Sequence, residues 1–452
     1  MINIRSDSRK VKPGDIFVAL KGISSNGSQY IEDAIKNGAS KLIVEEDGNY
    51  SIPYEVVDDS RKYLENYLVN NYNKYLDEMT LIGITGTNGK TTTAFLLYDA
   101  LNKLGRKCAY MGTIGFYLED KVYSLPNTSP DVTEVYDMII TAYDSGYRYM
   151  TLEISSHGLD MNRLEGINFD YAVFTNLTQD HLDFHKDMDD YFNAKKKLFE
   201  KLPNDGFAII NADDFTYDGL KKCTSASVYS YGVHNGDFKA ENLSLEMEDT
   251  QFDIDGMHIT SDLLSIANVY NLSAVYAVLK VLGYNKEDIA SIVSSLPHID
   301  GRMEKVYNGE FLALVDYAHS PDSVENALSF LSEIKKGRLI ALVGCGGDRD
   351  KTKRPKMAKV ACEKSDIAIL TSDNPRTEDP EAILKDMQEG LNYDNYYVIV
   401  NRKEAIQKAI SMAQPGDVIA VLGKGHEDYQ IIGTTKYHFS DKEEILEAVK
   451  GE

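Results

Sequence analysis

The sequence predicts an α/β protein of about three domains, in which mostly parallel sheets are covered by helices. Three observations point to this class. From residue 79 onward, short apolar strand patterns alternate with amphipathic helical patterns. One strand, within residues 81–93, runs into a glycine-bearing turn that opens a helix. The chain has 452 residues, which is enough for about three domains of ordinary size.

Each predicted domain has its own strand pattern. In residues 1–78, strand candidates at 15–20 and 41–45 flank a helical pattern at 30–36. The alternating pattern then occupies 79–299. A boundary near residue 300 precedes a C-terminal domain, 300–452, that we expect to be doubly wound, with strands at 312–316, 339–343, 367–370, 397–400 and 418–422. Its turn at residues 344–349 does not fit a dinucleotide site, because Arg349 stands where that turn needs a small residue.

Composition limits the partners and the compartment. The chain carries 48 Lys+Arg against 71 Asp+Glu, and its net charge of −23 argues against binding nucleic acid, whose phosphates need basic patches. Its four cysteines form no Cys-x-x-Cys pair, which is typical of reduced cytosolic thiols. No apolar run approaches the roughly 18 residues of a membrane span. We expect a cytoplasmic monomer without nucleic-acid or membrane partners.

The turn after the strand at residues 81–85 has the pattern of a phosphate-binding loop. Gly86 and Gly89 allow backbone N–H groups to face a phosphate, and the helix that begins near Lys90 adds its positive dipole end. Lys90 would reach the β- and γ-phosphates, and the Thr91 hydroxyl would bind Mg²⁺. The general pattern has a glycine where this chain has Ile84, so an ordinary strand-to-helix turn is the alternative.

Two later strands end in side chains that suit a cation beside a triphosphate. The strand at 148–154 ends near Glu153, and open α/β sheets bind ligands at the carboxyl ends of their strands. Glu153 is a candidate Mg²⁺ ligand, although a solvated strand end would look the same. The strand that begins at Tyr171 leads into a loop with His181 and His185. Their spacing would suit zinc on a helix, but no nearby Cys or further His completes such a site.

Lys195 lies where a lysine is unexpected. If residues 191–199 form a helix, about 100° per residue gathers apolar side chains on one face. These side chains are Tyr191, Phe192, Ala194, Leu198 and Phe199. Lys195 falls in the middle of that face, whereas Lys196 and Lys197 fall outside it. An apolar surround lowers the pKa of a lysine, and a neutral amine can add CO₂ to form a metal-binding carbamate. From the residues alone, a snorkelling lysine is the simpler interpretation.

Several strings, taken in order, resemble segments of the Mur ligases and of the related folylpolyglutamate synthases. The loop at 86–92, the string Asn176-Leu177-Thr178-Gln179-Asp180-His181 and the string Ala194-Lys195-Lys196-Lys197-Leu198-Phe199 resemble the ATP and metal segments. Asp7-Ser8-Arg9 and Asp373-Asn374-Pro375-Arg376 resemble the branch that adds the third peptide residue. The latter string by itself would be a β-turn with a surface arginine. The chain is identified as a member of the Mur ligase family.

The resemblance implies an ATP-dependent acid–amino-acid ligase of peptidoglycan precursor synthesis, and hence a role in cell wall biogenesis, cell shape and cell division. It would add meso-diaminopimelate to the D-Glu side-chain carboxylate of UDP-N-acetylmuramoyl-L-Ala-D-Glu through an acyl phosphate. The implied architecture has a small UDP-binding α/β domain at 1–78, a P-loop-type ATPase domain at 79–299 and a Rossmann-like amino-acid-binding domain at 300–452. The chain begins closer to Asp7 than the family usually does, so a leading element is expected to be missing.

The resemblance also implies which residues act on ATP and metal. ATP contacts are expected from Gly86, Thr87, Asn88, Gly89, Lys90, Thr91, Thr92, Asn268, Asn271, Arg302 and Asp316. His319 is a further expected contact. Two Mg²⁺ ions are implied, one on Thr91 and Glu153 and the other on His181 and carbamylated Lys195. The implied catalytic residues are Lys90, Lys195 and His181. The stretch at 264–266 lacks the glycine and aromatic often found there.

Substrate contacts are implied along the whole chain. Ser8 and the loop Gly22–Ser25 would touch the nucleotide of the UDP substrate. Further substrate contacts are expected at Asn127, Thr128, Ser129, Ser155, Arg163, Arg349, Asp373, Asn374, Pro375, Arg376, Gly423 and Glu427. Arg376 would hold the distal carboxylate of diaminopimelate in a bidentate pair, Arg349 another carboxylate, and Glu427 an ammonium. Met161 departs from the family, which has a polar residue there.

Three alternatives remain open. A lysine-adding ligase of the same family would differ at the position of Arg376. A folylpolyglutamate synthase shares the phosphate loop but neither Asp-Ser-Arg nor Asp-Asn-Pro-Arg. From a different class, a nucleotide-dependent regulatory ATPase would release phosphate without an amino-acid acceptor, and would leave Arg349 and Arg376 unexplained.

Overall fold

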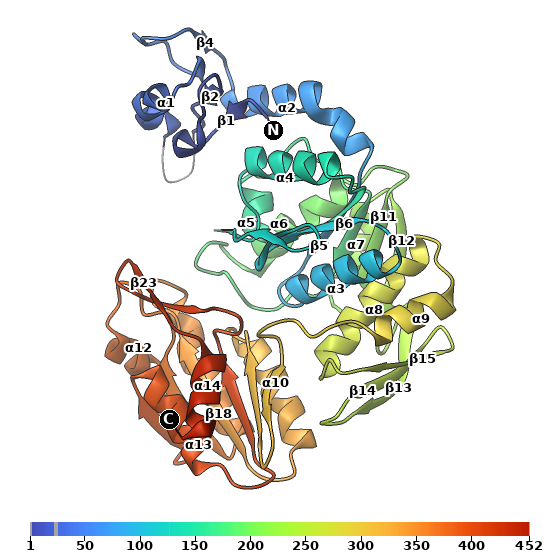
Figure 1. Cartoon of the computed structure of the whole chain (residues 1–452), viewed down its shortest axis with the longest axis vertical. Coiled ribbons are helices and arrows are strands. Elements are labelled where there is room, and N and C mark those ends of the chain that lie inside the picture. Colours follow the sequence, from blue (N-terminus) through green and yellow to red (C-terminus); the bar gives the residue numbers. More distant parts are fainter. Residues whose placement is uncertain (1, 22–25, 126, 452) are drawn as a thin grey trace.

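The computed structural model describes residues 2–21, 26–125 and 127–451 and folds around three main sheets (Figure 1). The first is a small parallel sheet of β1 (Ile4–Arg5), β2 (Ile16–Val18), β3 (Lys41–Val44) and β4 (Tyr54–Val56). Short helices η1 (Ser8–Lys10), η2 (Gly27–Tyr30) and α1 (Ile31–Lys36) accompany it, and α2 (Ser60–Asp77) leads away from it. The predicted strands at 15–20 and 41–45 are present in shorter form.

The second sheet has the order β15-β14-β13-β12-β11-β10-β5-β9-β6-β7-β8. Its parallel middle runs from β13 to β6, and antiparallel hairpins extend both ends. Its strands are β5 (Thr80–Thr85), β6 (Cys108–Gly112), β7 (Gly115–Tyr117), β8 (Lys121–Tyr123), β9 (Tyr149–Glu153), β10 (Tyr171–Phe174), β11 (Phe207–Asn211), β12 (Ser227–Gly232), β13 (Phe238–Leu245), β14 (Thr250–Ile254) and β15 (Met257–Ser261). Because β5 lies in the parallel middle of the sheet, the phosphate loop that follows it lies near the middle of the edge formed by the carboxyl ends of the strands.

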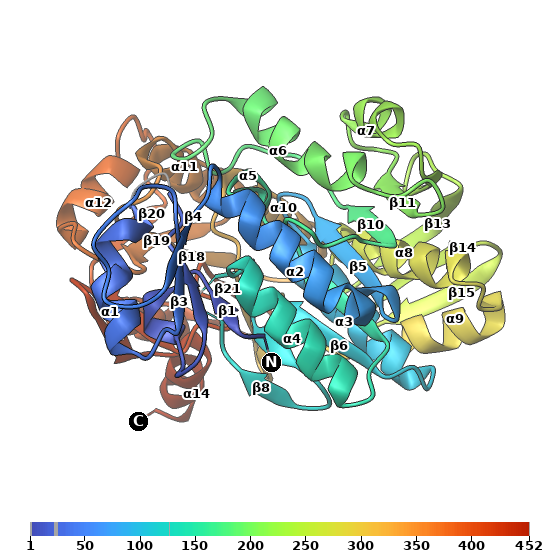
Figure 2. The ribbon, with the colours of Figure 1, turned by 90° about the horizontal axis from the view of Figure 1, so that it is seen from above.

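Helices cover both faces of this second sheet. Successive residues of β5 point to opposite faces, so that Leu81 joins one apolar core and Ile82 the other. One core includes α2 and the helices α4 (Val132–Asp144), α5 (Ser156–Asp160), α6 (Met188–Glu200) and α7 (Tyr217–Cys223). The other includes α3 (Lys90–Lys103), α8 (Ile266–Val281) and α9 (Lys286–Ser294). Figure 2 shows α2 and α4, which are in contact, lying side by side across the sheet.

The third sheet has the order β16-β17-β21-β18-β19-β20 and is parallel except for β16. Its strands are β16 (Glu304–Asn308), β17 (Leu312–Asp316), β18 (Leu339–Cys345), β19 (Ile367–Ser372), β20 (Tyr396–Ile399) and β21 (Val418–Leu422). One face packs on α10 (Pro321–Ile334), α11 (Arg354–Lys364) and α12 (Pro380–Met387), and the other on α13 (Arg402–Met412) and α14 (Asp441–Lys450). Helices on both faces confirm the doubly wound expectation. A short helix, η3 (Lys351–Lys353), precedes α11.

A separate hairpin of β22 (Tyr429–Ile432) and β23 (Thr435–His438) stands beside this third sheet. The carboxyl ends of β17, β18, β19 and β21 face those of β5, β9 and β10 across one cavity, described below. No helix among the described residues is both long and apolar enough to cross a membrane.

The first sheet is anchored on the second by polar and apolar contacts. Ile2 and Ile4 join the apolar core that α4 shares. The buried Arg5 guanidinium contacts the carboxylates of Asp15 and Asp137, and the Ile2 amide donates to Asp137 Oδ1 over 2.9 Å. Because Asp137 lies on α4, these contacts tie the N-terminal unit to the unit that carries the phosphate loop.

Candidate active site

A single cavity of about 1230 Å³ lies between the second and third sheets. The structure brings most of the predicted site residues to its wall. Those that line it are Thr87, Asn88, Gly89, Lys90, Thr91, Thr92, Asn127, Thr128, Ser155, Arg163, His181, Lys195, Asn268, Asn271, Arg302, Asp316, His319, Arg349, Asp373, Asn374, Arg376, Gly423 and Glu427. Residues distant in the sequence therefore form one site.

Five predicted residues do not line this cavity. Gly86, Ser129 and Glu153 lie behind its wall and hold residues that do, as described below, and Pro375 is buried beside Asn374. Ser8 belongs to the N-terminal unit, where it is buried and its carbonyl accepts from the Asn37 side chain over 2.9 Å. The expected nucleotide loop Gly22–Ser25 lies outside the described residues.

The phosphate loop has the expected geometry. It connects β5 to α3, and α3 begins at Lys90. Gly89 has a left-handed φ of 83°, and Gly86 is packed so closely that an added Cβ would lie 1.8 Å from Thr175 Oγ1. Lys90 Nζ donates to the carbonyls of Gly86 and Thr87 over 3.0 and 2.7 Å. Burial lowers the pKa of Lys90, although Glu153 and Asp180 act in the opposite direction.

Glu153 is a fully buried carboxylate at the end of β9 that accepts several hydrogen bonds. Thr91 Oγ1 donates to Oε2 over 2.9 Å, and the Thr113 amide and hydroxyl donate to the two oxygens over 2.9 and 3.0 Å. The Tyr110 hydroxyl also donates to Oε1. Thr91 and Glu153, which were predicted to share one Mg²⁺, are hydrogen-bonded to each other, and the burial of Glu153 excludes the solvated strand end.

Arg302 crosses from the start of the C-terminal unit to the phosphate loop. Its Nη2 donates to Thr91 Oγ1 over 3.2 Å, and its guanidinium lies 4.5 Å from the centre of the Tyr317 ring. Its buried Nε has no hydrogen-bond partner among the described residues. A buried guanidinium N–H that faces a cavity and lacks an acceptor is suited to an anionic oxygen of a ligand.

Lys195 is buried in α6, with 1% of its surface exposed. Its Nζ donates to the Gly86 carbonyl over 2.6 Å and lies 4.3 Å from the centre of the Tyr191 ring. The same carbonyl accepts from Lys90, so two amines share one acceptor. Burial first, and the neighbouring Lys90 second, lower the pKa of Lys195 well below its usual range. The expected burial is confirmed, and the snorkelling alternative is wrong.

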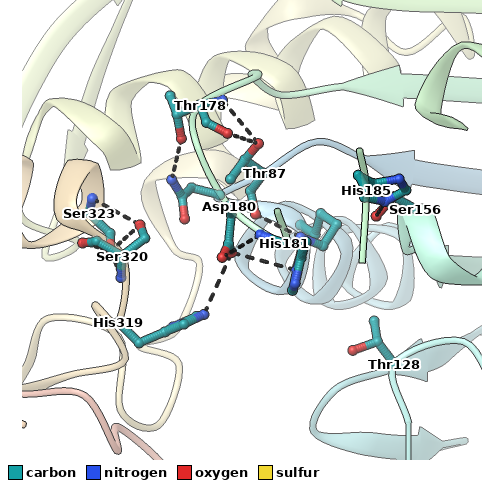
Figure 3. Close-up of polar contacts among 12 residues, drawn as sticks. Thr87, Thr128, Ser156, Thr178, Asp180, His181, His185, His319, Ser320 and Ser323 are labelled. Atoms are coloured by element: carbon teal, nitrogen blue, oxygen red, sulfur yellow. Dashed lines mark hydrogen bonds and ion pairs between the residues drawn. The ribbon is translucent and has the colours of Figure 1, made fainter. Parts of the chain in front are cut away.

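His181 lies in the loop after β10, beside a buried aspartate (Figure 3). Asp180 Oδ2 is 3.5 Å from His181 Nε2 and 3.9 Å from Nε2 of His319, which belongs to the C-terminal unit. Burial lowers the pKa of His181 to about 3, which Asp180 only partly offsets. Burial would raise the pKa of Asp180, but His181, His319 and Lys353 outweigh it and lower that pKa. Asp180 thus joins the two halves of the cavity.

The zinc alternative does not fit the geometry. His181 has a left-handed φ of 55°, so the segment is not helical there. His185 Nε2 pairs with Ser156 Oγ at 3.0 Å instead of sharing a site with His181. Among the residues that the structure describes, no three His, Cys, Asp or Glu side chains gather into a metal-binding group. Such groups typify zinc, whereas Mg²⁺ bound with phosphate needs only one or two protein ligands.

The two asparagines of α8 are linked to the phosphate helix. Thr93 Oγ1 donates to Asn271 Oδ1 over 3.1 Å, Asn271 Nδ2 donates to Asn268 Oδ1 over 3.0 Å, and Asn268 Nδ2 donates to the Leu264 carbonyl over 2.7 Å. Both line the cavity while making these internal contacts. Asp316, opposite, accepts from the Met303 and Ala318 amides over 2.7 and 2.8 Å, and its burial raises its pKa.

The polar wall near Glu153 is built by the predicted Thr-Ser stretch. Ser129 Oγ donates to the Glu153 carbonyl over 3.1 Å and accepts from the Ser155 amide over 2.9 Å. Thr128 and Thr113 hydroxyls are 3.0 Å apart. Arg163 Nη1 donates to the Ser129 carbonyl over 3.0 Å. Ser129 therefore orders the wall from behind, while Thr128, Ser155 and Arg163 face the cavity.

The far end of the cavity carries the Asp373–Arg376 turn after β19. Asn374 Nδ2 donates to Glu427 Oε2 over 2.8 Å, and the fully buried Lys424 donates to Asn374 Oδ1 and Glu427 Oε2 over 3.2 and 3.0 Å. Burial, with the neighbouring Asp373 carboxylate, raises the pKa of Glu427. Arg376 Nη1 donates to the Gly347 carbonyl over 2.8 Å. Arg349 is exposed at the same rim.

Sequence reasoning missed residues that hold the predicted ones. Tyr110 and Thr113 order Glu153, and Gly112 makes room, because an added Cβ there would lie 2.1 Å from Glu153 Oε1. The string Gly112-Thr113-Ile114-Gly115 is the signal that could have indicated this approach. Lys424, between two glycines at 423 and 425, is a second such residue. Nothing local predicts the meeting of Asp180 with His319.

The cavity fits a nucleoside triphosphate with Mg²⁺. At Gly86 the phosphate loop packs so closely against Thr175 and Asn176 that a Cβ would not fit. Arg302 presents an unpaired buried donor, and Thr91 with Glu153 offers hard oxygen ligands. Lys90 Nζ lies at the loop, where it donates to the Gly86 carbonyl, and Lys195 Nζ donates to the same carbonyl.

Family models match most of the chain. "Mur ligase family, catalytic domain" matches residues 2–81, "Mur ligase middle domain" 84–279 and "Mur ligase, glutamate ligase domain" 301–425. A Clostridium botulinum protein named UDP-N-acetylmuramoyl-L-alanyl-D-glutamate–2,6-diaminopimelate ligase is 42% identical over 99% of this chain and 95% of its own length. A Bacillus cereus protein of the same name is 40% identical over 99% and 94%.

Solved structures of related ligases also resemble this chain. A structure of a UDP-N-acetylmuramoyl-L-alanyl-D-glutamate–2,6-diaminopimelate ligase superposes with a TM-score of 0.70 at 33% identity, covering 99% of this chain and 94% of that one. A MurF ligase from Thermotoga maritima in complex with ADP has a TM-score of 0.72 at 19% identity, covering 99% and 97%, and shows likeness of fold alone.

Proposed function

The chain belongs to the Mur ligase family, and we propose that it joins meso-diaminopimelate to the D-Glu side-chain carboxylate of UDP-N-acetylmuramoyl-L-Ala-D-Glu at the cost of ATP. The observation that carries this proposal is the Asp373–Arg376 turn in the same cavity as the phosphate loop. One end of the cavity suits a triphosphate and the other suits a zwitterionic acceptor. Relatives about 40% identical over nearly the whole chain carry the name of this activity.

The first half-reaction is a phosphoryl transfer. The substrate carboxylate attacks the γ-phosphorus of ATP, ADP leaves and an acyl phosphate forms. In this proposal Lys90 turns from the Gly86 and Thr87 carbonyls to the β- and γ-phosphates, and Arg302 offers its unpaired Nε to another phosphate oxygen. Asn268, Asn271 and Asp316 border the proposed nucleoside end.

Two metal positions are proposed from the residues at the phosphate loop. Thr91 and Glu153 would hold one Mg²⁺, and His181 with a carbamate on Lys195 would hold the other. Bound Mg²⁺ neutralises charge that develops on the transferring phosphoryl group. The burial of Lys195 beside Gly86 favours a neutral amine, which is the form that adds CO₂. The carbamate would place an anion next to Lys90 where a neutral amine stood.

The second half-reaction forms the amide. The acceptor amine attacks the acyl carbon, loses a proton, and the tetrahedral intermediate expels inorganic phosphate. We propose that Arg376 pairs with the distal carboxylate of diaminopimelate, Arg349 with another carboxylate, and Glu427 with an ammonium. Asp373, Asn374, Pro375 and Gly423 shape this end. The closed cavity would protect the acyl phosphate from water.

The three predicted units divide the work in this proposal. Residues 1–78, with Ser8, would hold the UDP end of the substrate. Residues 79–299 would hold ATP, and 300–452 would hold the incoming amino acid. The wall formed by Asn127, Thr128, Ser129, Ser155 and Arg163 would hold the muramoyl-peptide between them. We further propose that the chain acts as a cytoplasmic monomer without nucleic-acid partners.

The first test is product formation from the UDP-dipeptide, ATP and Mg²⁺, with meso-diaminopimelate and L-lysine supplied separately. We expect tripeptide with diaminopimelate, and Arg376→Ala should lower its preference over lysine by about 100-fold, the scale of two hydrogen bonds to a charged group. Arg106→Ala, which changes an exposed arginine just after the carboxyl end of α3 and outside the cavity lining, is the matched control.

Other outcomes separate the alternatives. Product with lysine only would keep the ligase but overturn the acceptor. Product only when folate and glutamate replace both substrates would favour a folylpolyglutamate synthase, whose solved Mycobacterium tuberculosis example shares the fold at 16% identity. Steady ATP hydrolysis with no ligated product would favour a regulatory ATPase.

A further inference from the structure

The β22–β23 hairpin is bound to the acceptor turn through backbone hydrogen bonds. The Arg376 amide donates to the Ile431 carbonyl over 3.0 Å, and the Gly433 amide donates to the Arg376 carbonyl over 2.7 Å. These two bonds form a short parallel bridge between Arg376 and Ile432. The hairpin thus contacts the main chain of Arg376 on both sides, without belonging to the main sheet. In Figure 1 it stands at the end of the third sheet nearest the N-terminal unit.

The hairpin also holds Asp373 and Asn374, at the start of the turn that ends at Arg376. Gln430 Nε2 donates to the Asp373 carbonyl over 2.6 Å, and the Ile431 amide donates to Asn374 Oδ1 over 2.9 Å. Asp373, Asn374 and Arg376 therefore each receive at least one hydrogen bond from this hairpin. Of the hairpin's hydrogen bonds to the turn described here, only that of Gln430 uses a hairpin side chain. A substitution of Gln430 can therefore remove this bond without altering the backbone.

Arg376 has a backbone conformation that needs such support. Its φ of 52° lies in the left-handed region, which is unfavourable for a non-glycine residue. Residues keep such conformations where their surroundings fix them, often at ligand-binding positions. The guanidinium is also held in place, because Nη1 donates to the Gly347 carbonyl over 2.8 Å, and it lies so close to Gly346 that an added Cβ there would be 2.8 Å from Nη1. The backbone direction of Arg376 consequently decides where its charged end can point.

The hairpin is itself fastened at several points. Lys436 Nζ lies 3.9 Å from the centre of the Tyr429 ring on the opposite strand, and both residues line the cavity. The Phe439 amide donates to the Asp428 carbonyl over 3.0 Å and closes the base. A two-stranded hairpin is marginally stable alone, so its position depends on such contacts and on the acceptor turn. The hairpin and the Asp373–Arg376 turn therefore fix each other's position.

We propose that the β22–β23 hairpin sets acceptor selectivity by fixing Arg376, and that Gln430 is its positioning residue. This inference rests on the proposed function, in which Arg376 pairs with the distal carboxylate of the acceptor. Gln430 touches no substrate in this scheme. It holds the Asp373 carbonyl, and through the turn it fixes the direction of Arg376.

The test is Gln430→Met, which keeps the length of the side chain but removes the donor. The Michaelis constant for meso-diaminopimelate should rise about 5-fold, the scale of one hydrogen bond, while kcat and the Michaelis constants for ATP and the UDP-dipeptide stay within about 2-fold. Gln430→Glu, which places a carboxylate against the Asp373 carbonyl, should raise the Michaelis constant for meso-diaminopimelate further. Thr435→Ala, an exposed residue of the same hairpin, should leave all constants unchanged.

Failure here and failure of the proposed function give different results. If the unaltered chain ligates diaminopimelate but Gln430→Met keeps the wild-type Michaelis constant, the role of Gln430 is wrong and the ligase stands. A variant that loses kcat and all three affinities together also overturns the inference, because a general structural role would do this. If the unaltered chain makes no tripeptide, the proposed function itself fails.

Discussion

Three consecutive lysines in α6 have different surroundings. Lys195 is buried against Tyr191 and donates to the phosphate loop, whereas Lys196 is half-buried and pairs with Glu200 across 2.8 Å. The helical periodicity of the apolar residues predicted this difference correctly. One residue, or about 100° around the helix, therefore separates a half-buried lysine in an ion pair from a fully buried one beside the phosphate loop.

The proposed carbamate can be seen directly. Protein equilibrated with ¹³C-bicarbonate should show a carbamate carbon resonance, and Lys195→Ala should lack both this signal and at least about 99% of the ligase activity, since a metal ligand is lost. Lys196→Ala is the matched control and should keep both. A carbamate signal that survives in Lys195→Ala would contradict the assignment.

Residue-level prediction worked where one element carries the information. The phosphate loop and Lys195 are each specified by a strand or helix pattern of about ten residues. It failed for Asp180, because its partner His319 comes from another sheet and no local pattern records which loops will meet. Tyr110 and Thr113 were missed for the same reason: they hold Glu153 from a neighbouring strand.

At the scale of elements, a buried arginine fastens α11 to the segment before α12. Arg354 has no exposed surface and forms a bidentate pair with Glu378 at 2.8 and 3.0 Å, and it reaches Asp386 at 2.7 Å. Glu378 also accepts from the Asp348 amide over 2.6 Å. These contacts connect the loops after β18 and β19, which carry Arg349 and Arg376.

This pair predicts a pH-dependent stability. Arg354 lowers the pKa of Glu378 to about 2, and burial, which by itself raises that pKa, offsets it only in part. A lowered folded pKa stabilises the fold above the ordinary value of 4.5, and that contribution is lost as pH falls toward 2. Glu378→Gln should cost about 2 kcal/mol in the free energy of unfolding at pH 7, the scale of hydrogen bonds to a charged group.

The measurement is urea unfolding of both proteins at a series of pH values. The difference between wild type and Glu378→Gln should shrink between pH 4.5 and 2. Glu381→Gln changes an exposed carboxylate on α12 and should show little difference at any pH. A Glu378→Gln difference that stays constant down to pH 2 would show that the lost contact is not ionic.

The order and type of the elements followed from the sequence better than their ends did. The strand expected at 15–20 is only Ile16–Val18, because Asp15 and Leu20 use their backbone groups in turns instead of in the sheet. The strand expected at 397–400 is shifted by one residue, to Tyr396–Ile399. Strand ends are decided by neighbouring strands, and these are not visible in a local pattern.

At the scale of the whole molecule, the cavity exists only because two sheets meet. Besides Asp180 and His319, Asn88 Nδ2 donates to Asp322 Oδ2 over 3.1 Å across the same junction. The link from Arg302 to Thr91 adds a third connection. Lys356 Nζ also donates to Gln179 Oε1 over 3.0 Å. We expect these contacts to break and re-form as substrates enter and leave, because closure around a site between two units commonly precedes chemistry.

Asp180→Asn tests this junction with an isosteric change. Removing the negative charge that acts on Lys353 of the C-terminal unit should weaken the closed arrangement and lower kcat about 10-fold, with a larger radius of gyration by small-angle scattering in the presence of ATP and Mg²⁺. Asp189→Asn, an exposed residue at the start of α6, is the control. Lower kcat with an unchanged radius would assign Asp180 to the chemistry alone.

The division of the cavity between two different sheets has a consequence for how such chains diversify. The residues proposed to choose the acceptor follow β18, β19 and β21, whereas those proposed to handle ATP follow β5, β9 and β10. The two sets lie in different stretches of the chain. Evolution can therefore exchange the amino acid that is incorporated by rewriting one stretch, while the machinery that activates the carboxylate is inherited intact.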